Sequence, residues 1–131
     1  MSAYKTINCS FKDKKTLLDC LKALNFNPIE YEHKYRLQGY MNDLREQEAE
    51  IIVAKQQISH ASNDLGFTYS DKDKEYLMIC SDYDLHRGLG DKIKQSYAIT
   101  AIKSALKKNK FSVKEEITEN NKVKISAGKI I

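Results

Sequence analysis

The run EYLMICSD, residues 75–82, constrains the fold more than any other stretch. Its residues from Tyr76 to Cys80 are all apolar. A strand with one face in water alternates polar and apolar side chains, so an unbroken apolar run predicts a central strand that is covered on both faces. The chain is therefore expected to build a sheet in which this strand lies inside.

Other segments predict the rest of that sheet. Residues 4–11 alternate in character, as do residues 29–39, and residues 49–58 are rich in β-branched side chains. We interpret Glu-Gln-Glu at 46–48 as a turn or an exposed extension. Strands are predicted at 4–11, 29–39, 49–58, 66–70, 75–82, 111–117 and 122–128, the last two as an antiparallel hairpin.

Two segments have the period of a helix. In residues 13–26, Leu17, Leu21 and Leu24 share one face, and Asp13 is placed to cap the start. The longer segment covers residues 89–109. Its predicted apolar face, expected to pack on the sheet, consists of Tyr97, Ala98, Ala101, Ile102, Ala105 and Leu106.

The order of these segments indicates an α+β fold. Strand, helix and two strands are followed by further strands, and then again by strand, helix and two strands, which hints at two similar β-α-β-β halves. One antiparallel sheet with two helices packed on one face accounts for this order. One proline and five glycines leave no flexible linker, so we predict a single domain over residues 1–131.

The composition is that of a soluble globular protein. Apolar residues make up 41% of the chain and charged residues 31%, and no apolar run approaches the roughly 18 residues of a membrane span. The N-terminal sequence has no apolar core before a cleavage site, so no secretory signal is expected. Cys9, Cys20 and Cys80 lie far apart, which favours buried thiols over disulfides. We expect a cytoplasmic protein without membrane contact.

The segment SDYDLHRGLGDK, residues 81–92, is dense in ionisable side chains. Asp82, Asp84 and His86 recur at every second position, a spacing that could hold a metal, and the glycines could admit a phosphate at a helix start. The segment does not contain the sequence motif of a P-loop or of a dinucleotide-binding site. We therefore interpret the segment as the start of a helix, predict no metal and no cofactor, and keep His86 and Arg87 as candidate anion contacts.

Positive charge is concentrated in the last third of the chain. Residues 92–131 carry ten lysines against three glutamates, a charge of +7, whereas residues 1–91 carry 12 basic and 15 acidic residues, a charge of −3. A solvated helix face gives such a pattern, and so does a surface that holds a phosphate backbone or an acidic protein. The candidate ligand contacts on the predicted helix face are Lys92, Lys103, Lys107 and Lys110.

Several stretches together resemble one family, the hypothetical chloroplast reading frame proteins of cyanobacteria, algal plastids, other bacteria and phages. The matching stretches are FKDKKTLLDCLKALNF at 11–26, Gly-Tyr at 39–40, NDLGF at 63–67, EYLMICSD at 75–82, QSYA at 95–98 and LKKNKF at 106–111. Ser96 stands where relatives often have an arginine. The resemblance implies a domain without an established activity, substrate or cofactor. It also implies a protein partner, because bacterial relatives occur near genes for AAA-type ATPases.

A small non-enzymatic binding or adaptor protein is the predicted function, since no nucleophile elbow or histidine cluster names a reaction. Tyrosine is favoured at interfaces, and the candidate interface residues are Tyr31, Tyr35, Tyr40 and Tyr69. One alternative is a virus-encoded protein that sequesters a nucleotide-like ligand, as a homo-oligomer. The other is weak, sequence-independent nucleic-acid binding through the lysine row. A viral protein would act in the host cytoplasm, and a plastid-encoded one in the stroma.

Overall fold

The structure is a computed structural model that describes residues 3–108, 111–117 and 123–129. Contacts between residues divide the chain into two compact units, Met1–Tyr97 and Ala98–Ile131, and each is described by itself. The single domain expected over residues 1–131 stays a prediction. The elements are β1 (Tyr4–Phe11), α1 (Lys14–Ala23), β2 (Ile29–Gln38), β3 (Leu44–Val53), η1 (Lys55–Gln57), β4 (Leu65–Ser70), β5 (Glu75–Ser81), α2 (Asp82–His86), α3 (Leu89–Lys108), β6 (Phe111–Ile117) and β7 (Val123–Lys129).

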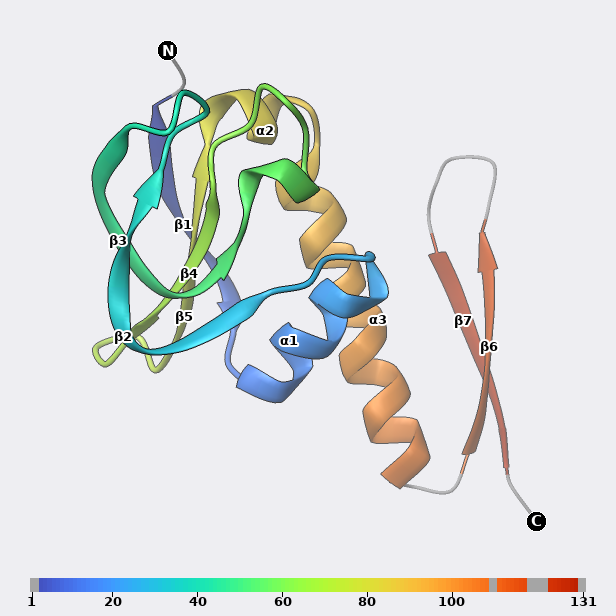
Figure 1. Cartoon of the computed structure of the whole chain (residues 1–131). Helices are drawn as coiled ribbons and strands as arrows, with labels where there is room; N and C mark the ends of the chain where they lie inside the picture. The colour runs from blue at the N-terminus through green and yellow to red at the C-terminus, as the bar shows by residue number, and fades with distance from the viewer. Residues whose placement is uncertain (1–2, 109–110, 118–122, 130–131) are drawn as a thin grey trace. The chain divides into compact units, whose positions relative to one another are not determined.

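The first unit is built on a five-stranded antiparallel sheet with the strand order β1-β5-β4-β3-β2. β5 lies between β1 and β4, and Met78, Ile79 and Cys80 in it are buried. The predicted central strand is therefore confirmed. Helix α1 and the beginning of α3 pack on one face of this sheet (Figure 1), so the α+β class with helices on one face is confirmed.

Helix α1 begins and packs as its sequence predicts. The Asp13 carboxylate accepts a hydrogen bond from the Thr16 amide over 2.9 Å, which satisfies one of the free donors at the helix start. Leu17 and Leu21 are fully buried in the core between helices and sheet. The buried Ser96 hydroxyl donates to the Cys20 carbonyl over 2.9 Å, so a short side chain at position 96 links α3 to α1.

The predicted apolar face of the long helix is wrong in part. The ring of Tyr97 lies 4.8 Å from that of Phe11, which confirms its packing role. Ala98, Ile102 and Ala105, however, are exposed. The core of the first unit takes its α3 residues from the beginning of the helix, up to Tyr97. Periodicity continues along a helix whether or not a core accompanies it, so the pattern overestimated the packed length.

The β2–β3 hairpin forms one end of the sheet, and residues of this hairpin pack over the face of the sheet that lies opposite the helices. Successive side chains of a strand point to opposite faces, and the neighbours of Ile79 belong to the helix-side core, so Ile79 points away from the helices. The buried residues that pack with it are Leu37, Ala49 and Ile52. Gly66 on β4 permits this close approach, because a Cβ there would come within 2.8 Å of the Cβ of Ala49.

The register between the two strands of this hairpin is irregular. Glu30 pairs with Ile51 and Tyr35 with Ala49, so β2 advances five residues while β3 advances two, and residues 31–34 form a wide bulge. Of the two interpretations of residues 46–48, the turn is wrong, because these residues lie inside β3, where Glu46 and Glu48 are exposed. The turn comes earlier: the Gly39 amide donates to the Asp43 carbonyl over 2.8 Å, and Asn42 takes a φ of 64°. Exposed charges in β3 had the composition of a turn.

The second unit contains the rest of α3 and an antiparallel pair of strands. β6 and β7 pair from Phe111 with Lys129 to Ile117 with Val123, which confirms the predicted hairpin. They form a two-stranded sheet of their own, so the last two strands of the second suggested half lie outside the five-stranded sheet. The residues expected to turn between them, 119–121, lie outside the described ranges. Among the helices of the described ranges, none has the length and apolarity to cross a membrane.

Candidate functional site

The segment 81–92 contains a helix start, as interpreted from its sequence, and in fact two helices, α2 and α3, begin in it. The Ser81 hydroxyl caps α2 by accepting from the Asp84 amide over 3.2 Å. On this helix Asp84 is buried, whereas Asp82 and His86 border one surface hollow, where Asp82 pairs with Lys5 over 3.2 Å and His86 Nδ1 lies 2.8 Å from the Asp82 carbonyl. Within the described part of the chain, no group of three or more possible metal ligands is found.

Asp84 is a buried carboxylate, 3% exposed. It accepts hydrogen bonds from the hydroxyls of Ser62 over 2.7 Å and Ser81 over 2.8 Å. The Ser59 hydroxyl lies a further 2.7 Å from that of Ser62. Burial of a charge is costly unless it is hydrogen-bonded, and here both oxygens are bonded. Asp84 thus ties α2 to the loop before β4 and to the end of β5.

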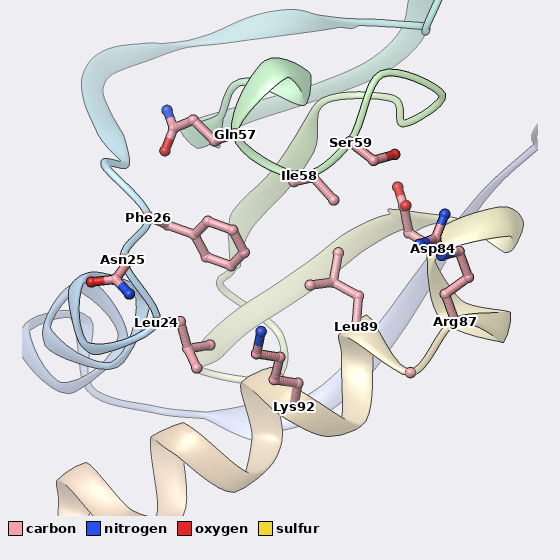
Figure 2. A pocket seen from close by; sticks show the side chains of 11 residues that line it. Leu24, Asn25, Phe26, Gln57, Ile58, Ser59, Asp84, Arg87, Leu89 and Lys92 are labelled. Carbon is pink, nitrogen blue, oxygen red and sulfur yellow. The ribbon is translucent and has the colours of Figure 1, made fainter.

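A pocket of about 340 Å³ lies beside Asp84, and we call it the α1–α3 pocket (Figure 2). Phe26, Ile58 and Leu89 converge on it from three segments. Phe26 is positioned by the end of α1, where Asn25 has a φ of 67° and the Phe26 amide donates to the Leu21 carbonyl over 3.0 Å. The residues that line the pocket are Leu24, Asn25, Phe26, Gln57, Ile58, Ser59, Asp84, Arg87, Gly88, Leu89 and Lys92.

The charges of the α1–α3 pocket are largely engaged within the protein. The Arg87 guanidinium donates to the Tyr83 hydroxyl and lies 5.2 Å from the centre of its ring. Asp84 is bonded to two serines, as described above. Lys92 at the start of α3 is exposed. The volume is at the lower limit of ligand pockets. Every buried side-chain nitrogen or oxygen atom in the lining of this pocket has a hydrogen-bond partner.

A larger hollow of about 720 Å³ lies along the bulged hairpin, and we call it the β2–β3 groove. It begins beside the bulge, where the two strands separate, and reaches η1. Ile29, Tyr35 and Leu44 on its surface are 48%, 51% and 57% exposed. The residues that line it are Ile29, Tyr31, Lys34, Tyr35, Arg36, Gln38, Leu44, Glu48, Ile52, Ala54, Lys55, Gln56 and Asp64.

Lys55 is the unusual residue of this groove, because it is a lysine that is only 7% exposed. Its ammonium donates to the Gln38 side-chain oxygen over 3.1 Å. The ion pairs found among the described residues all involve other cations, so no described carboxylate lies within 4.0 Å of the Lys55 ammonium. An ammonium has three donors, and a neutral amide oxygen compensates its burial only in part.

Asp64 fixes the backbone around Lys55. Its two carboxylate oxygens accept from the backbone amides of Lys55 over 2.9 Å and of Gln38 over 3.0 Å. The Asp64 carbonyl accepts from the Tyr4 hydroxyl over 2.6 Å. Burial, and then the Asp64 charge, raise the pKa of Tyr4 well above its ordinary value, so the phenol stays protonated and continues to donate. Lys55 and Gln38 are thereby held in one arrangement.

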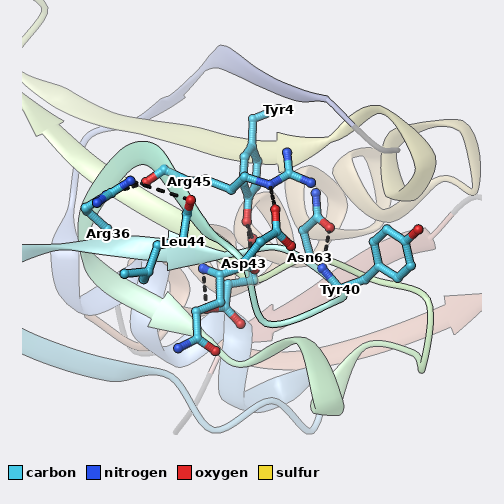
Figure 3. Close-up of polar contacts among 9 residues, drawn as sticks. Tyr4, Arg36, Tyr40, Asp43, Leu44, Arg45 and Asn63 are labelled. Carbon is cyan, nitrogen blue, oxygen red and sulfur yellow. Dashed lines mark hydrogen bonds and ion pairs between the residues drawn. The ribbon is translucent and has the colours of Figure 1, made fainter.

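Two further cations line the groove beside a pair of aromatic rings. The rings of Tyr31 and Tyr35 lie 4.5 Å apart, tilted by 51°. Arg36 donates from Nε to the Arg45 carbonyl over 2.7 Å and from Nη2 to the Leu44 carbonyl over 3.5 Å (Figure 3). Neither Lys34 nor Arg36 forms an ion pair with a described carboxylate. Three cations against Glu48 and Asp64 give the groove a charge of +1.

The predicted interface tyrosines do not form one surface. Tyr31 and Tyr35 line the β2–β3 groove. Tyr40 follows β2 at the turn, where its amide donates to the Asn63 side chain over 2.9 Å (Figure 3). Tyr69 on β4 packs against Tyr76 with ring centres 5.2 Å apart. The structure thus brings two of the four together, and their role as contacts stays a prediction.

The predicted ligand-binding residues are also divided. Arg87 and Lys92 line the α1–α3 pocket, whereas His86 borders a shallow hollow with Lys5 and Asp82. Lys103 and Lys107 belong to the second unit, and Lys110 lies outside the described residues. Their roles stay predictions.

Sequence reasoning missed Lys55 and its partners Gln38 and Asp64. The available signal was a lysine directly after the apolar run IIVA, residues 51–54, since a charge next to a buried strand is a candidate for burial. The loop before β4 carries Asp64, which accepts a hydrogen bond from the Lys55 amide. No pattern in the sequence near Lys55 predicts this contact.

The fold and the groove define a small α+β protein with a single antiparallel sheet in its first unit and a hollow large enough for a ligand. The chain belongs to the family described as protein of unknown function (DUF1257), whose model matches residues 20–125. The matched range includes every residue that lines the β2–β3 groove. Comparison with curated proteins and with solved structures gave no match.

Proposed function

We propose that the protein is a small non-enzymatic binding protein, and that the β2–β3 groove is its site for a ligand with an anionic group. The observation that carries this proposal is Lys55, a lysine residue that is 7% exposed and lines the groove, and whose ammonium has, among the described residues, only the neutral Gln38 side chain as a partner. A carboxylate or phosphate oxygen of a ligand would complete its hydrogen bonds and balance its charge.

The surroundings of Lys55 support binding rather than catalysis. Lys34 and Arg36 add positive charge on the same side, and the groove volume is within the range of small-molecule sites. The Asp64 carboxylate is occupied by two backbone amides, so it is not placed to exchange protons with a ligand. The groove therefore has the cationic side chains of an anion site, and its Asp64 carboxylate holds the backbone around Lys55.

Calorimetric titration of the full chain with pyrophosphate, and in parallel with citrate, tests this proposal. Lys55→Met keeps the length of the side chain and removes the charge. We expect it to weaken pyrophosphate binding by at least roughly ten-fold, the value of a charged hydrogen bond. Citrate distinguishes a carboxylate preference from a phosphate preference. Equal affinity of the natural chain and Lys55→Met for both anions would overturn the proposal.

The matched control is Lys72→Met, which removes the same charge from the exposed turn between β4 and β5. It is expected to leave the affinity for pyrophosphate unchanged within about two-fold, because exposed charges outside a site act weakly through a salt solution. The melting temperature of Lys55→Met is expected to be no lower than that of the natural chain, since replacing a buried charge by an apolar side chain is often neutral or stabilising.

The other predicted functions have weaker support. An AAA-type ATPase partner, a plastid or phage origin and a cytoplasmic location follow from the resemblance and from composition. Nucleic-acid binding needs the lysine row, of which Lys103 and Lys107 belong to the second unit. These stay predictions, and the anion groove is the function that side-chain geometry favours.

A further inference from the structure

We infer that the β2–β3 groove takes a nucleotide, whose base stacks on Tyr35 while its phosphates bind Lys55 and the cations beside it. This inference rests on the proposed function and names its ligand class. It starts from the arrangement of aromatic and cationic side chains in one hollow. An inorganic anion would use only the cations, whereas a ligand that also carries a flat apolar group would use the whole lining.

The irregular pairing of β2 with β3 accompanies this arrangement. In a regular strand neighbouring side chains point to opposite faces, but Lys34, Tyr35 and Arg36 all line the groove. The register shifts once before Tyr35 and again after Arg36, and such irregularities redirect side chains at the edge of a sheet. An aromatic ring and the two cations that flank it in sequence are therefore available to one ligand.

The Tyr31–Tyr35 pair offers a stacking surface that is partly prepared. The two rings are in contact at 4.5 Å, and Tyr35 keeps 51% of its surface exposed. The ring of Tyr31 contacts that of Tyr35 and restricts its rotation. Less side-chain entropy is therefore lost when a base stacks on Tyr35. Bases of all kinds stack on such rings because each has a π-face.

The cations are placed for phosphates rather than for the base. Lys55 lies at the end of the groove formed by η1, with two ammonium donors not used by Gln38. Arg36 is held on backbone carbonyls of the β2–β3 turn and has no described ion-pair partner. Glu48 pairs in register with Arg36 and is the acid that a phosphate chain has to avoid, so the inferred contacts lie on the side of Lys55.

Calorimetric titration of the full chain with ADP and with pyrophosphate separates the base from the phosphates. Both ligands present a diphosphate, but only ADP presents a base. We expect ADP to bind roughly ten-fold more tightly than pyrophosphate, the gain of one base–aromatic stack. Tyr35→Leu keeps an apolar side chain without the ring, and is expected to abolish this difference. Tyr69→Leu, on an exposed tyrosine outside the groove, is expected to preserve it.

The outcomes distinguish this inference from the proposed function. Tighter binding of ADP that depends on Tyr35 supports the inference. Equal binding of ADP and pyrophosphate by the natural chain, with both lost in Lys55→Met, overturns the nucleotide and leaves the anion groove in place. If neither ligand binds, both the inference and the phosphate form of the proposed function fail. The comparison of the two ligands uses the natural chain, so it does not depend on the folding of a variant.

Discussion

Of the charged residues that are buried in the described part of the chain, Asp84 and Lys55 have different environments. The Asp84 carboxylate accepts hydrogen bonds from two serine hydroxyls, whereas the Lys55 ammonium has a single neutral partner among the described residues. The sequence indicated a helix start within residues 81–92, and the structure shows that Ser81 and Asp84 there have the local spacing of a helix cap. The sequence did not indicate Lys55, since the contacts that bury this residue come from Gln38 and Asp64, distant in the chain. The helix start was predictable from neighbouring residues, whereas the contacts of Lys55 with residues elsewhere in the chain were not.

Removal of the Asp84 carboxylate is expected to destabilise the fold. In Asp84→Ala the hydroxyls of Ser62 and Ser81 lose their acceptor in a buried site, and the lost hydrogen bonds to a charge predict a decrease of about 2–4 kcal/mol in the free energy of unfolding. Urea unfolding followed by circular dichroism measures it. Asp82→Ala, which breaks a half-exposed ion pair with Lys5, should cost at most about 1 kcal/mol. Equal losses in the two variants would contradict this account of Asp84.

The buried thiols predict a dependence of stability on pH. Burial raises the pKa of Cys20 and of Cys80 to about 12, from an ordinary 9.0. The folded chain therefore retains protons that the unfolded chain releases above pH 9. The stability that these thiols contribute is complete below pH 9 and is lost as the pH rises toward 12, by up to about 1.4 kcal/mol per pH unit for each thiol.

The variant Cys20→Ala/Cys80→Ala isolates this effect from other groups that titrate in the same range. We expect the free energy of unfolding, measured in urea between pH 8 and pH 10.5 (pH values chosen to bracket the ordinary thiol pKa), to decline less steeply in the double variant than in the natural chain. Parallel pH profiles would show that the thiols do not contribute.

At the scale of elements, periodicity predicted most strands and both long helices. It failed where tertiary contacts decide. Residues 46–48 are polar in composition like a turn, yet they lie inside β3, where Glu48 pairs with Arg36 of β2. The bulge at 31–34 shifts the register without a glycine or proline to announce it. The groove depends on this bulge, so the candidate site was less predictable than the fold around it.

Gly66 tests the close packing of the β2–β3 hairpin on the sheet. A Cβ at this position would lie 2.8 Å from the Cβ of Ala49 and 2.9 Å from a methyl carbon of Leu37. Gly66→Ala is expected to lower the free energy of unfolding by about 1–3 kcal/mol through overpacking. Adding Ala49→Gly removes one of the two clashing groups and should restore part of the loss. If the second substitution only adds to the destabilisation, the hairpin does not pack as described.

At the scale of the whole molecule, the groove belongs to one unit. Its lining residues lie between Ile29 and Asp64, inside the unit Met1–Tyr97. A chain that ends at Lys108 lacks β6 and β7 but keeps all of α3. We expect it to bind pyrophosphate with an affinity within about two-fold of the full chain, because it keeps every described residue that lines the groove. A much larger loss, in a shortened chain with an unchanged melting temperature, would assign part of the site to residues 109–131.

The most direct test of the anion groove is a titration of the ¹⁵N-labelled full chain with pyrophosphate, followed by the backbone amide signals. The account predicts that the largest shifts occur at Lys55, at Gln38 and Asp64 beside it, along the bulge at residues 31–34, and at Tyr35 and Arg36 after it. Shifts concentrated at Arg87 and Lys92 would assign anion binding to the α1–α3 pocket instead. That result would contradict the central claim.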